Sequence, residues 1–166
     1  MPFAYYRDQG TVYGSDLSLA MLGQARRKLR SPVRGLLTAE GTALPFRDGV
    51  ADTIVATFVC CVQEDPRPSL AEMARVLRPG GQVLCLDYTL AERGPVRLTM
   101  RLLQPALHAI YGIHWEHNVP KLLAGAGLQL REVQPLWSPI VRYIAADKPT
   151  ISVDLVIRQD GIPEGV

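Results

Sequence analysis

The chain has 166 residues, a length that suits one domain with a single hydrophobic core. Its hydrophobic fraction of 48%, charged fraction of 20% and formal net charge of +2 are ordinary for a globular protein. The sequence has no basic stripe with interleaved aromatic residues and no apolar run of about 20 residues, so we expect neither nucleic-acid binding nor an integral membrane segment.

The first third of the chain has the pattern of a strand, a helix and a second strand. Residues 11–16 form a short strand pattern that ends in Asp16. Residues 17–30 are expected to be a helix, because their apolar residues fall near one face and their basic residues gather at the end where the helix dipole favours cations. Residues 33–39 are expected to form the next strand, although Gly35 weakens that pattern.

The central stretch, residues 51–88, predicts the fold class. Thr53–Val59 is a short apolar run with β-branched residues, which suits a strand buried on both faces. Ser69 precedes Glu72 by three residues, which predicts a capping box at the start of a helix. The residues 79–81, Pro-Gly-Gly, are expected to end that helix before a second buried strand. A strand–helix–strand unit of this length is a parallel crossover, so the chain belongs to the α/β class.

The last part of the chain alternates in a different way. Residues 96–111 predict a long amphipathic helix, and residues 118–125 predict a short one capped by Asn118. Residues 128–136 and 140–145 alternate between apolar and polar like an antiparallel strand pair.

The chain is expected to form one domain over residues 1–149, followed by a C-terminal tail, residues 150–166, that contains an extra edge-strand pattern. The first residues lack the pattern of a signal peptide, so a cytoplasmic location is expected. The three cysteines are expected to be reduced and mostly buried; they are Cys60, Cys61 and Cys85.

Three places carry candidate binding residues. Asp16 closes a strand just before a helix, where a carboxylate can accept both hydroxyls of a ribose; helix capping is the alternative. Glu40 and the backbone of residues 40–46 could contact the edge of an adenine, or form an ordinary loop with its apolar residues in the core. Thr57 and Phe58 lie at the carboxyl end of a central strand, where ligands bind in open α/β sheets; an ordinary strand end is the alternative.

The segment His-Trp-Glu-His at residues 114–117 is the candidate for proton transfer. Histidine is the usual base near neutral pH, and the tryptophan could supply an aromatic wall. The alternative is a partly exposed turn. Two histidines without further clustered ligands fill too few positions for zinc, so no metal site is expected.

Together these residues resemble the class I S-adenosylmethionine-dependent methyltransferases, and especially the small-molecule branch with the quinone-biosynthesis and phospholipid N-methyltransferases. The resemblance runs from about Thr11 to Pro149. The segments that carry it are Val12–Ser18 with Met21, Leu22 and Ala25; Glu40–Phe46 with Asp48, Gly49 and Asp52; Glu72 with Arg75–Gly81; and Tyr143–Pro149.

The resemblance implies a Rossmann-like, mostly parallel sheet with flanking helices and an antiparallel C-terminal strand pair. It implies S-adenosylmethionine as the cofactor and a small, hydrophobic or lipid-like methyl acceptor. The residues implied in cofactor binding are Asp16, Leu17, Glu40, Gly41 and Thr57. His114 and His117, in the segment where the family places a substrate-covering insertion, are the implied catalytic residues.

One departure from the family pattern stands out. The family opens with a strand and a glycine-rich turn, whereas only residues 1–10 precede the second-strand match here. The first strand and helix are therefore expected to be missing. Either the chain is truncated at its start, or it takes a strand from its own tail or from another chain, in a homodimer or with a strand-donating partner. Two other functions stay open: a non-catalytic, truncated methyltransferase fold, and a nicotinamide-dependent oxidoreductase, which shares the strand-end acid but would need a GxGxxG turn.

Overall fold

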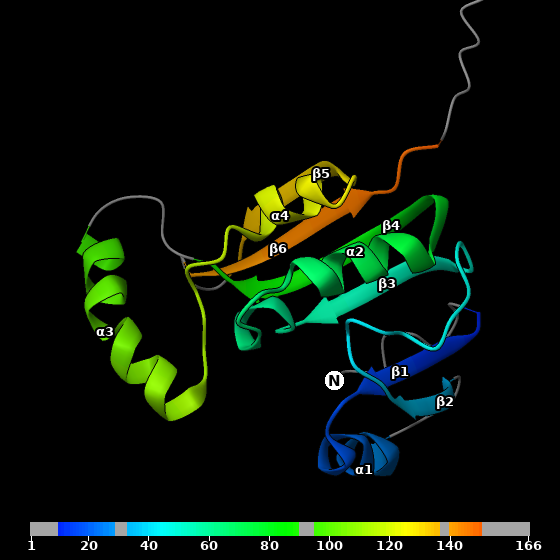
Figure 1. The fold of residues 1–166 in the computed structure, drawn as a ribbon, viewed down its shortest axis with the longest axis horizontal. Helices are drawn as coiled ribbons and strands as arrows, with labels where there is room; N and C mark the ends of the chain where they lie inside the picture. Colours follow the sequence, from blue (N-terminus) through cyan, green and yellow to red (C-terminus); the bar gives the residue numbers. More distant parts are fainter. Residues whose placement is uncertain (1–9, 29–32, 90–94, 137–139, 151–166) are drawn as a thin grey trace, which may run out of the picture.

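The computed structural model describes residues 10–28, 33–89, 95–136 and 140–150, and Figure 1 shows how their helices and strands are arranged. The strands form two sheets. One is the parallel pair β1-β2, and the other has the order β3-β4-β6-β5. The strands are β1 (Val12–Asp16), β2 (Val33–Thr38), β3 (Ala51–Thr57), β4 (Leu77–Tyr88), β5 (Gln129–Pro135) and β6 (Val141–Asp147).

Four α-helices and a short 3-10 turn connect these strands in the described part of the chain. They are α1 (Leu19–Lys28), η2 (Cys60–Val62), α2 (Arg67–Val76), α3 (Pro95–Tyr111) and α4 (Val119–Gly125). β3 and β4 are parallel, while β6 pairs antiparallel with both β4 and β5. The predicted α/β class and the antiparallel C-terminal pair are both confirmed. None of the helices in the described ranges is long and apolar enough to cross a bilayer.

The hydrophobic core lies between the larger sheet and the helices α2 and α4, which cover the same face of it in Figure 1. Leu70 of α2 and Leu123 of α4 are fully buried against Val83 of β4 and Ile144 of β6. Burying each such side chain stabilises the fold by about 1.5–3 kcal/mol.

The central strands form where the sequence predicts them, but the expected burial of β3 on both faces is wrong. Ala56 is buried, whereas Thr53 is exposed and Val55 is 43% exposed, because the described helices α2 and α4 cover one face of the sheet.

The predicted capping box at Ser69 and Glu72 is wrong. Helix α2 begins at Arg67 with Pro66 at its N-cap position, and no side chain caps it. Ser69 thus falls inside the first turn, and its hydroxyl donates to Gln63 Oε1 over 2.7 Å. Prolines favour the first helical turn, so the segment enters the helix earlier than the serine pattern indicates.

The Pro-Gly-Gly segment, residues 79–81, does not end a helix either. α2 ends at Val76, and these residues form an irregular beginning of β4. Gly80 has a φ of +75°, and a Cβ on Gly81 would lie 3.0 Å from the Asp52 carbonyl oxygen. Glycine is needed here because strand β3 approaches the backbone of β4 too closely for a side chain.

The β1-β2 pair is separate from the larger sheet. In Figure 1, β1 lies on the side of this pair that is nearer to β3, and no described strand pairs with the remaining edge of either strand. Helix α1 packs on β1 and β2 but has no fully buried residue. The predicted end of this helix at residues 29–30 and the predicted edge strand at 151–155 lie outside the described residues.

Candidate functional site

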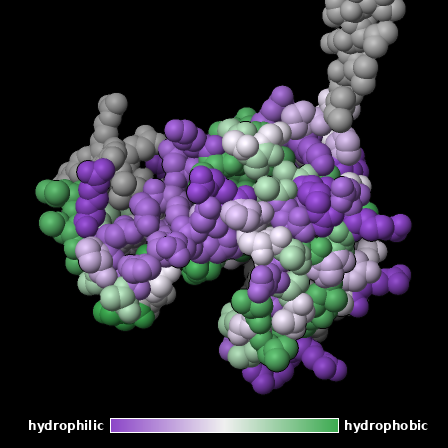
Figure 2. All heavy atoms as spheres, viewed as in Figure 1, coloured by the Kyte–Doolittle hydropathy of each residue, from purple (hydrophilic) through white to green (hydrophobic). Residues whose placement is uncertain are grey.

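The carboxyl ends of the parallel strands carry the candidate binding residues. Asp16 ends β1, and Thr57 ends β3. Ligands in open α/β sheets bind at this edge, because the loops after the strands gather there. Figure 2 shows that the visible face is hollowed between α3 and the unit of α1, β1 and β2.

Asp16 is half-buried, and one of its two carboxylate oxygens is engaged. The Ser18 backbone N–H donates to Asp16 Oδ1 over 2.8 Å. Ser18, rather than Asp16, caps α1, because its hydroxyl oxygen accepts from the Met21 N–H at 3.4 Å. Oδ2 of Asp16 accepts no hydrogen bond from the described part of the chain. The hydrogen bond from Ser18 orients the carboxylate and leaves its second oxygen for another donor.

A small cavity adjoins Asp16. It lies between α1 and the β1-β2 pair, and Gly14, Met21 and Leu36 help to line it. The other residues predicted to bind cofactor do not line this cavity. The cavity is therefore a gap in the packing of α1 on the strands, and it does not by itself connect Asp16 to the rest of the candidate site.

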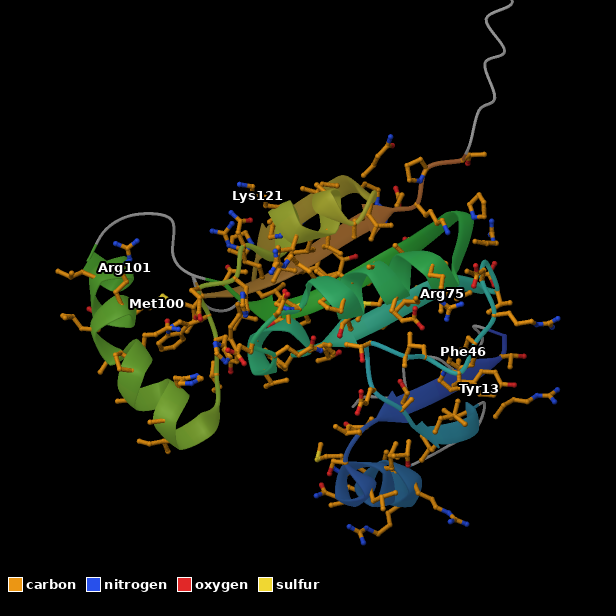
Figure 3. All side chains as sticks on the ribbon, viewed as in Figure 1. Tyr13, Phe46, Arg75, Met100, Arg101 and Lys121 are labelled. Atoms are coloured by element: carbon orange, nitrogen blue, oxygen red, sulfur yellow. The ribbon has the colours of Figure 1, made fainter. Side chains whose placement is uncertain are left out.

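The loop that follows β2 carries Glu40 and Gly41, and helix α2 holds it in place. Glu40 is exposed, and its carboxylate accepts from the Thr42 hydroxyl at 3.3 Å. A Cβ on Gly41 would lie 3.0 Å from Ser69 Oγ, so only glycine lets this loop approach α2 without displacing the serine. The ring of Phe46 contacts that of Tyr13 with centroids 5.7 Å apart, which ties the loop to β1 (Figure 3).

Glu72 and Arg75 of α2 form an ionic clamp on this loop. Glu72 accepts the Leu44 N–H at 2.8 Å, and Arg75 donates to the Phe46 carbonyl oxygen at 2.8 Å and to the carboxylate of Asp48. Arg75 and Glu72 also pair with each other at 2.7 Å. The hydrogen bond from the Arg75 guanidinium lowers the pKa of Glu72, and Glu72 in turn raises the pKa of Arg75. The sequence resemblance included both residues, and the structure shows what they contact.

The end of β3 is strained. Phe58, directly after Thr57, has a φ of +54° and is the one non-glycine residue with positive φ in the described ranges. Its N–H donates to the Leu86 carbonyl oxygen at 2.7 Å, and its ring packs on Tyr88 with centroids 4.9 Å apart. A bulky residue in this conformation costs about 1–3 kcal/mol, and such strain concentrates at functional sites.

Asp87 near the end of β4 fixes the turn that follows Phe58. Its carboxylate is 1% exposed and accepts the N–H groups of Cys60 at 2.7 Å, Cys61 at 3.2 Å and Tyr88 at 2.8 Å. The cysteines of η2 are free and buried, as the sequence predicts. Burial and, after it, the charge of Asp87 raise the pKa of Cys61 to about 12, so this thiol stays protonated at neutral pH.

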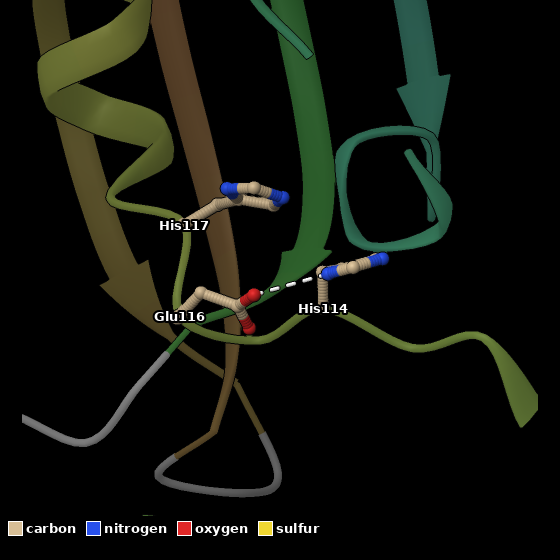
Figure 4. A group of neighbouring side chains, drawn as sticks. All are labelled: His114, Glu116 and His117. Atoms are coloured by element: carbon tan, nitrogen blue, oxygen red, sulfur yellow. Dashed lines mark hydrogen bonds and ion pairs between the residues drawn. The ribbon is translucent and has the colours of Figure 1, made fainter. Parts of the chain in front are cut away.

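The histidine segment lies against this turn. The His114 N–H donates to the Cys61 carbonyl oxygen at 2.6 Å. His114 Nδ1 lies 3.0 Å from Glu116 Oε1, and Figure 4 shows the two side chains with His117 beside them. His117 Nε2 lies 2.9 Å from the Gln63 carbonyl oxygen. A carbonyl only accepts, so Nε2 of His117 carries the proton and Nδ1 carries the lone pair of the neutral ring.

Gln63 joins two parts of the predicted site. Its carbonyl oxygen binds His117, its amide oxygen accepts from Ser69, and its amide nitrogen would lie 3.5 Å from a Cβ on Gly41. The structure therefore brings a predicted catalytic residue, His117, and a predicted cofactor residue, Gly41, next to the same glutamine. Asp16 and the 64%-exposed Leu17 belong to the β1-α1 unit and make none of these contacts.

Sequence reasoning missed the roles of several residues here. Gln63 has no motif that marks it, because its role depends on contacts with distant segments. Phe58 was marked only by its place at the end of a strand, which does not indicate its positive φ. Asp87 did have a signal: it is an acid near the end of a buried strand, the same pattern that marked Asp16. The difference is that Asp87 serves the backbone, with its carboxylate engaged by three N–H groups.

Known proteins with similar sequences include methyltransferases. The family described as "Methyltransferase domain" matches residues 1–85. Phosphatidylethanolamine N-methyltransferase of Cereibacter sphaeroides is 30% identical over 135 residues, which cover 79% of this chain and 66% of that protein. Demethylmenaquinone methyltransferase of Renibacterium salmoninarum is 36% identical over 93 residues, which cover 55% of this chain and 38% of that protein.

A solved structure has the same fold. The SAM-dependent methyltransferase of Methanosarcina mazei superposes with a TM-score of 0.66 at 18% identity, covering 84% of this chain and 82% of that one.

The chain spans only part of the length of its sequence relatives: 66% of the phosphatidylethanolamine N-methyltransferase and 38% of the demethylmenaquinone methyltransferase.

Proposed function

The chain belongs to the methyltransferase domain family, and from that premise we propose that it transfers a methyl group from S-adenosylmethionine to a small, hydrophobic or lipid-like acceptor. The observation that carries the proposal is the geometry at Asp16. This carboxylate ends a parallel strand just before a helix, is oriented by the Ser18 N–H, and keeps one oxygen for a further donor.

Asp16 and the loop after β2 would hold the cofactor. Oδ2 of Asp16 would accept from the ribose hydroxyls, with Leu17 beside it. Glu40 and Gly41 would lie on the adenine side, in the loop that the Glu72–Arg75 clamp holds. Thr57 would lie under the cofactor at the end of β3. When bound, S-adenosylmethionine supplies the electrophilic methyl group, so the protein needs mainly to position the acceptor and exclude water.

His114 and His117 are the proposed bases for the acceptor. The Glu116 carboxylate holds His114 with its proton on Nδ1, which leaves Nε2 to take a proton from a hydroxyl or an amine. The Gln63 carbonyl orients His117 in the same way and leaves its Nδ1 unprotonated. Either ring could accept the proton that a neutral acceptor must lose on methylation.

Helix α3 supports a hydrophobic acceptor. It lies next to the histidine segment in Figure 1, where it stands away from the larger sheet. Several of its large apolar side chains are exposed: Leu98, Leu102, Leu103 and Ile110. One of the two similar proteins is named for a lipid, phosphatidylethanolamine, and the other for a quinone. An acceptor with an apolar tail would cover part of this surface.

The open edges of β1 and β3 support a partner that donates a strand. Each of these strands has a described neighbour on one side only, and unpaired edge groups are a template for a further strand. A strand between them, from a partner or a second copy of the chain, would join the two sheets. It would also fix Asp16 relative to Thr57.

Calorimetric titration with S-adenosylhomocysteine tests the cofactor site. We expect the unmodified chain to bind, and Asp16→Ala to weaken binding by roughly 10–100-fold, because a hydrogen bond to a charged group contributes about 1.5–3 kcal/mol. Glu132→Gln, on strand β5 at the far edge of the larger sheet, is the matched control and should leave the affinity unchanged.

Activity is then measured as transfer of a labelled methyl group to phosphatidylethanolamine vesicles and to a demethylated menaquinone precursor. Transfer to either supports the proposal. Binding no tighter than millimolar, with no transfer to either acceptor, would favour the non-catalytic alternative instead.

A further inference from the structure

We propose that His114, Glu116 and His117 form a binding site for one divalent transition-metal ion, of which Zn²⁺ is the best suited. Each of the three side chains offers one ligand atom, and these atoms all lie within 4.8 Å of one another. Figure 4 shows the three side chains gathered on one short segment between α3 and α4. The two histidines alone would fill too few positions for zinc, but Glu116 adds a carboxylate to them. Two imidazoles and a carboxylate are a ligand set that zinc commonly takes in proteins.

The spacing is close to what an ion needs. Bonds of about 2.0–2.2 Å from a tetrahedral zinc place two ligand atoms roughly 3.3 Å apart. His114 Nδ1 and Glu116 Oε1 are already 3.0 Å apart. The ligand atom of His117 lies within 4.8 Å of both. Side-chain rotations that bring it about 1 Å closer would therefore complete a three-ligand site.

The surroundings of the histidines orient them for this role. Histidines that bind metal usually donate their other ring N–H to a backbone carbonyl or a carboxylate, which fixes the tautomer. His117 does so, since its Nε2–H donates to the Gln63 carbonyl oxygen and leaves Nδ1 unprotonated. His114 is fixed by its backbone bond to Cys61 and by the ring of His108, whose centroid lies 4.4 Å from its own.

The cysteines nearby do not compete for the ion. Cys60 and Cys61 are 1% exposed, and their backbone N–H groups are turned to Asp87. A metal ligand must be a thiolate, and a buried thiol with no approach from solvent is a poor one. The three protein ligands thus leave a fourth position open, as in zinc sites that exchange a water molecule.

This inference does not rest on the proposed methyl transfer. The ion would bind Nδ1 of His117, which is also the nitrogen proposed to accept a proton there. It would bind Nδ1 of His114, which carries the proton when Nε2 of that ring acts as the base. The metal-loaded and proton-accepting forms of the site therefore exclude each other. Metal binding is therefore measured without cofactor or acceptor, and its failure would leave the proposed function untouched.

The test uses the chain without a histidine tag, after treatment with a chelator. Calorimetric titration with ZnCl₂ should give one ion per chain. The changes His117→Gln, Glu116→Gln and His114→Gln should each weaken binding by about tenfold or more, because each removes one of three ligands. His108→Asn is the matched control: it removes a histidine that contacts the cluster but is outside the ligand set, and it should change the affinity much less.

Circular dichroism on each variant checks folding. Glu116 is exposed, so Glu116→Gln keeps the test decisive even if a histidine variant does not fold. Titration with Co²⁺, followed by visible absorption, should show bands of nitrogen and oxygen ligation. Equal affinity in the unmodified chain and in Glu116→Gln and His117→Gln, or a thiolate-to-cobalt charge-transfer band, would overturn the assignment.

Discussion

At the scale of single residues, Asp87 has a structural role in the site that no sequence motif indicated. It is a buried carboxylate whose two oxygens accept three backbone N–H groups, and it thereby fixes the turn on which His114 rests. Hydrogen bonds to a charged acceptor are roughly twice as strong as neutral ones. The position of the histidine segment thus depends on an acid that lies outside it.

The change Asp87→Asn tests this dependence. An amide has one acceptor oxygen, and its NH₂ group would face a backbone N–H, so at least one buried donor loses its partner. We expect the free energy of unfolding to fall by about 2–3 kcal/mol in urea denaturation. Asp52→Asn is the control, since the exposed Asp52–Arg78 pair should contribute under about 1 kcal/mol. Equal effects of the two changes would show that Asp87 is dispensable.

The buried thiols predict a loss of stability in alkali. Burial and, after it, the charge of Asp87 raise the pKa of Cys61 and of Cys85 from 9.0 to about 12. Between these values the unfolded chain releases thiol protons that the folded chain retains, so the free energy of unfolding falls as pH rises from about 9 to about 12. Cys85→Ala should make this fall shallower. The check is urea denaturation across that pH range, and an unchanged slope in the variant would contradict the expectation.

At the scale of elements, α2 acts as the support for the loop after β2. Its Arg75 and Glu72 bind the loop backbone, and Lys148 donates to the carbonyl oxygens of Ala74 and Leu77 at its C-terminal end. A lysine at a helix C-terminus satisfies carbonyls that the helix leaves unpaired and suits the helix dipole. The loop residues Glu40 and Gly41 are thus held by a helix that the sheet and α4 hold in turn.

Arg75→Met should release this loop. The change removes the donors to the Phe46 carbonyl and Asp48 and leaves Glu72 with the Leu44 N–H but without its ion-pair partner, so amide hydrogen exchange over residues 40–49 should become faster. Stability should fall by about 1–3 kcal/mol. Arg67→Met, which breaks the exposed pair with Asp65, is the control and should change stability by less than about 1 kcal/mol.

The same clamp makes the loop sensitive to acid. Arg75 lowers the pKa of Glu72 below its ordinary 4.5, so this carboxylate stabilises the fold above pH 4.5 and loses that contribution as the pH falls through its lowered value.

For the Arg75→Met variant, unchanged amide hydrogen exchange over residues 40–49 would show that other contacts hold the loop.

At the scale of the whole molecule, the described residues form a large sheet with a good core and a small unit with a weak one. The core helices α2 and α4 pack on the larger sheet, whereas β1 and β2 form a two-stranded sheet under a helix with no fully buried residue. Two-stranded sheets are marginally stable unless something else packs on them. The proposed ribose acid, Asp16, belongs to this less stable unit.

Native-state amide hydrogen exchange should therefore be faster in the β1-β2 sheet than in the larger sheet. Amides of β1 and β2 should exchange at least about tenfold faster than those of β4 and β6, because local opening costs less free energy there. S-adenosylhomocysteine should slow exchange at Gly14–Asp16, since a bound ligand stabilises the state that binds it. Uniform exchange over both sheets would contradict this division. Protection by the ligand only in the larger sheet would place the cofactor away from Asp16.

The sequence by itself determined the elements and the family. Apolar runs and alternation predicted strands at the positions of β1 to β6, and Asn118 caps α4 by accepting the Lys121 N–H at 3.1 Å, as expected. The family implied by Val12–Ser18 and Arg75–Gly81 is confirmed by the comparisons. These features depend on neighbours in the chain, so a local pattern suffices to specify them.

Only the tertiary structure decided how the site is assembled. Ser69 looked like a helix cap but bonds Gln63, and Gly81 looked like a helix stop but lets β3 approach β4. His117 reaches Gln63 across 54 residues of sequence, and Asp87 reaches Cys60 across 27. Contacts over such separations are set by which strands lie side by side and by what the core leaves unpaired, and no short segment carries that information.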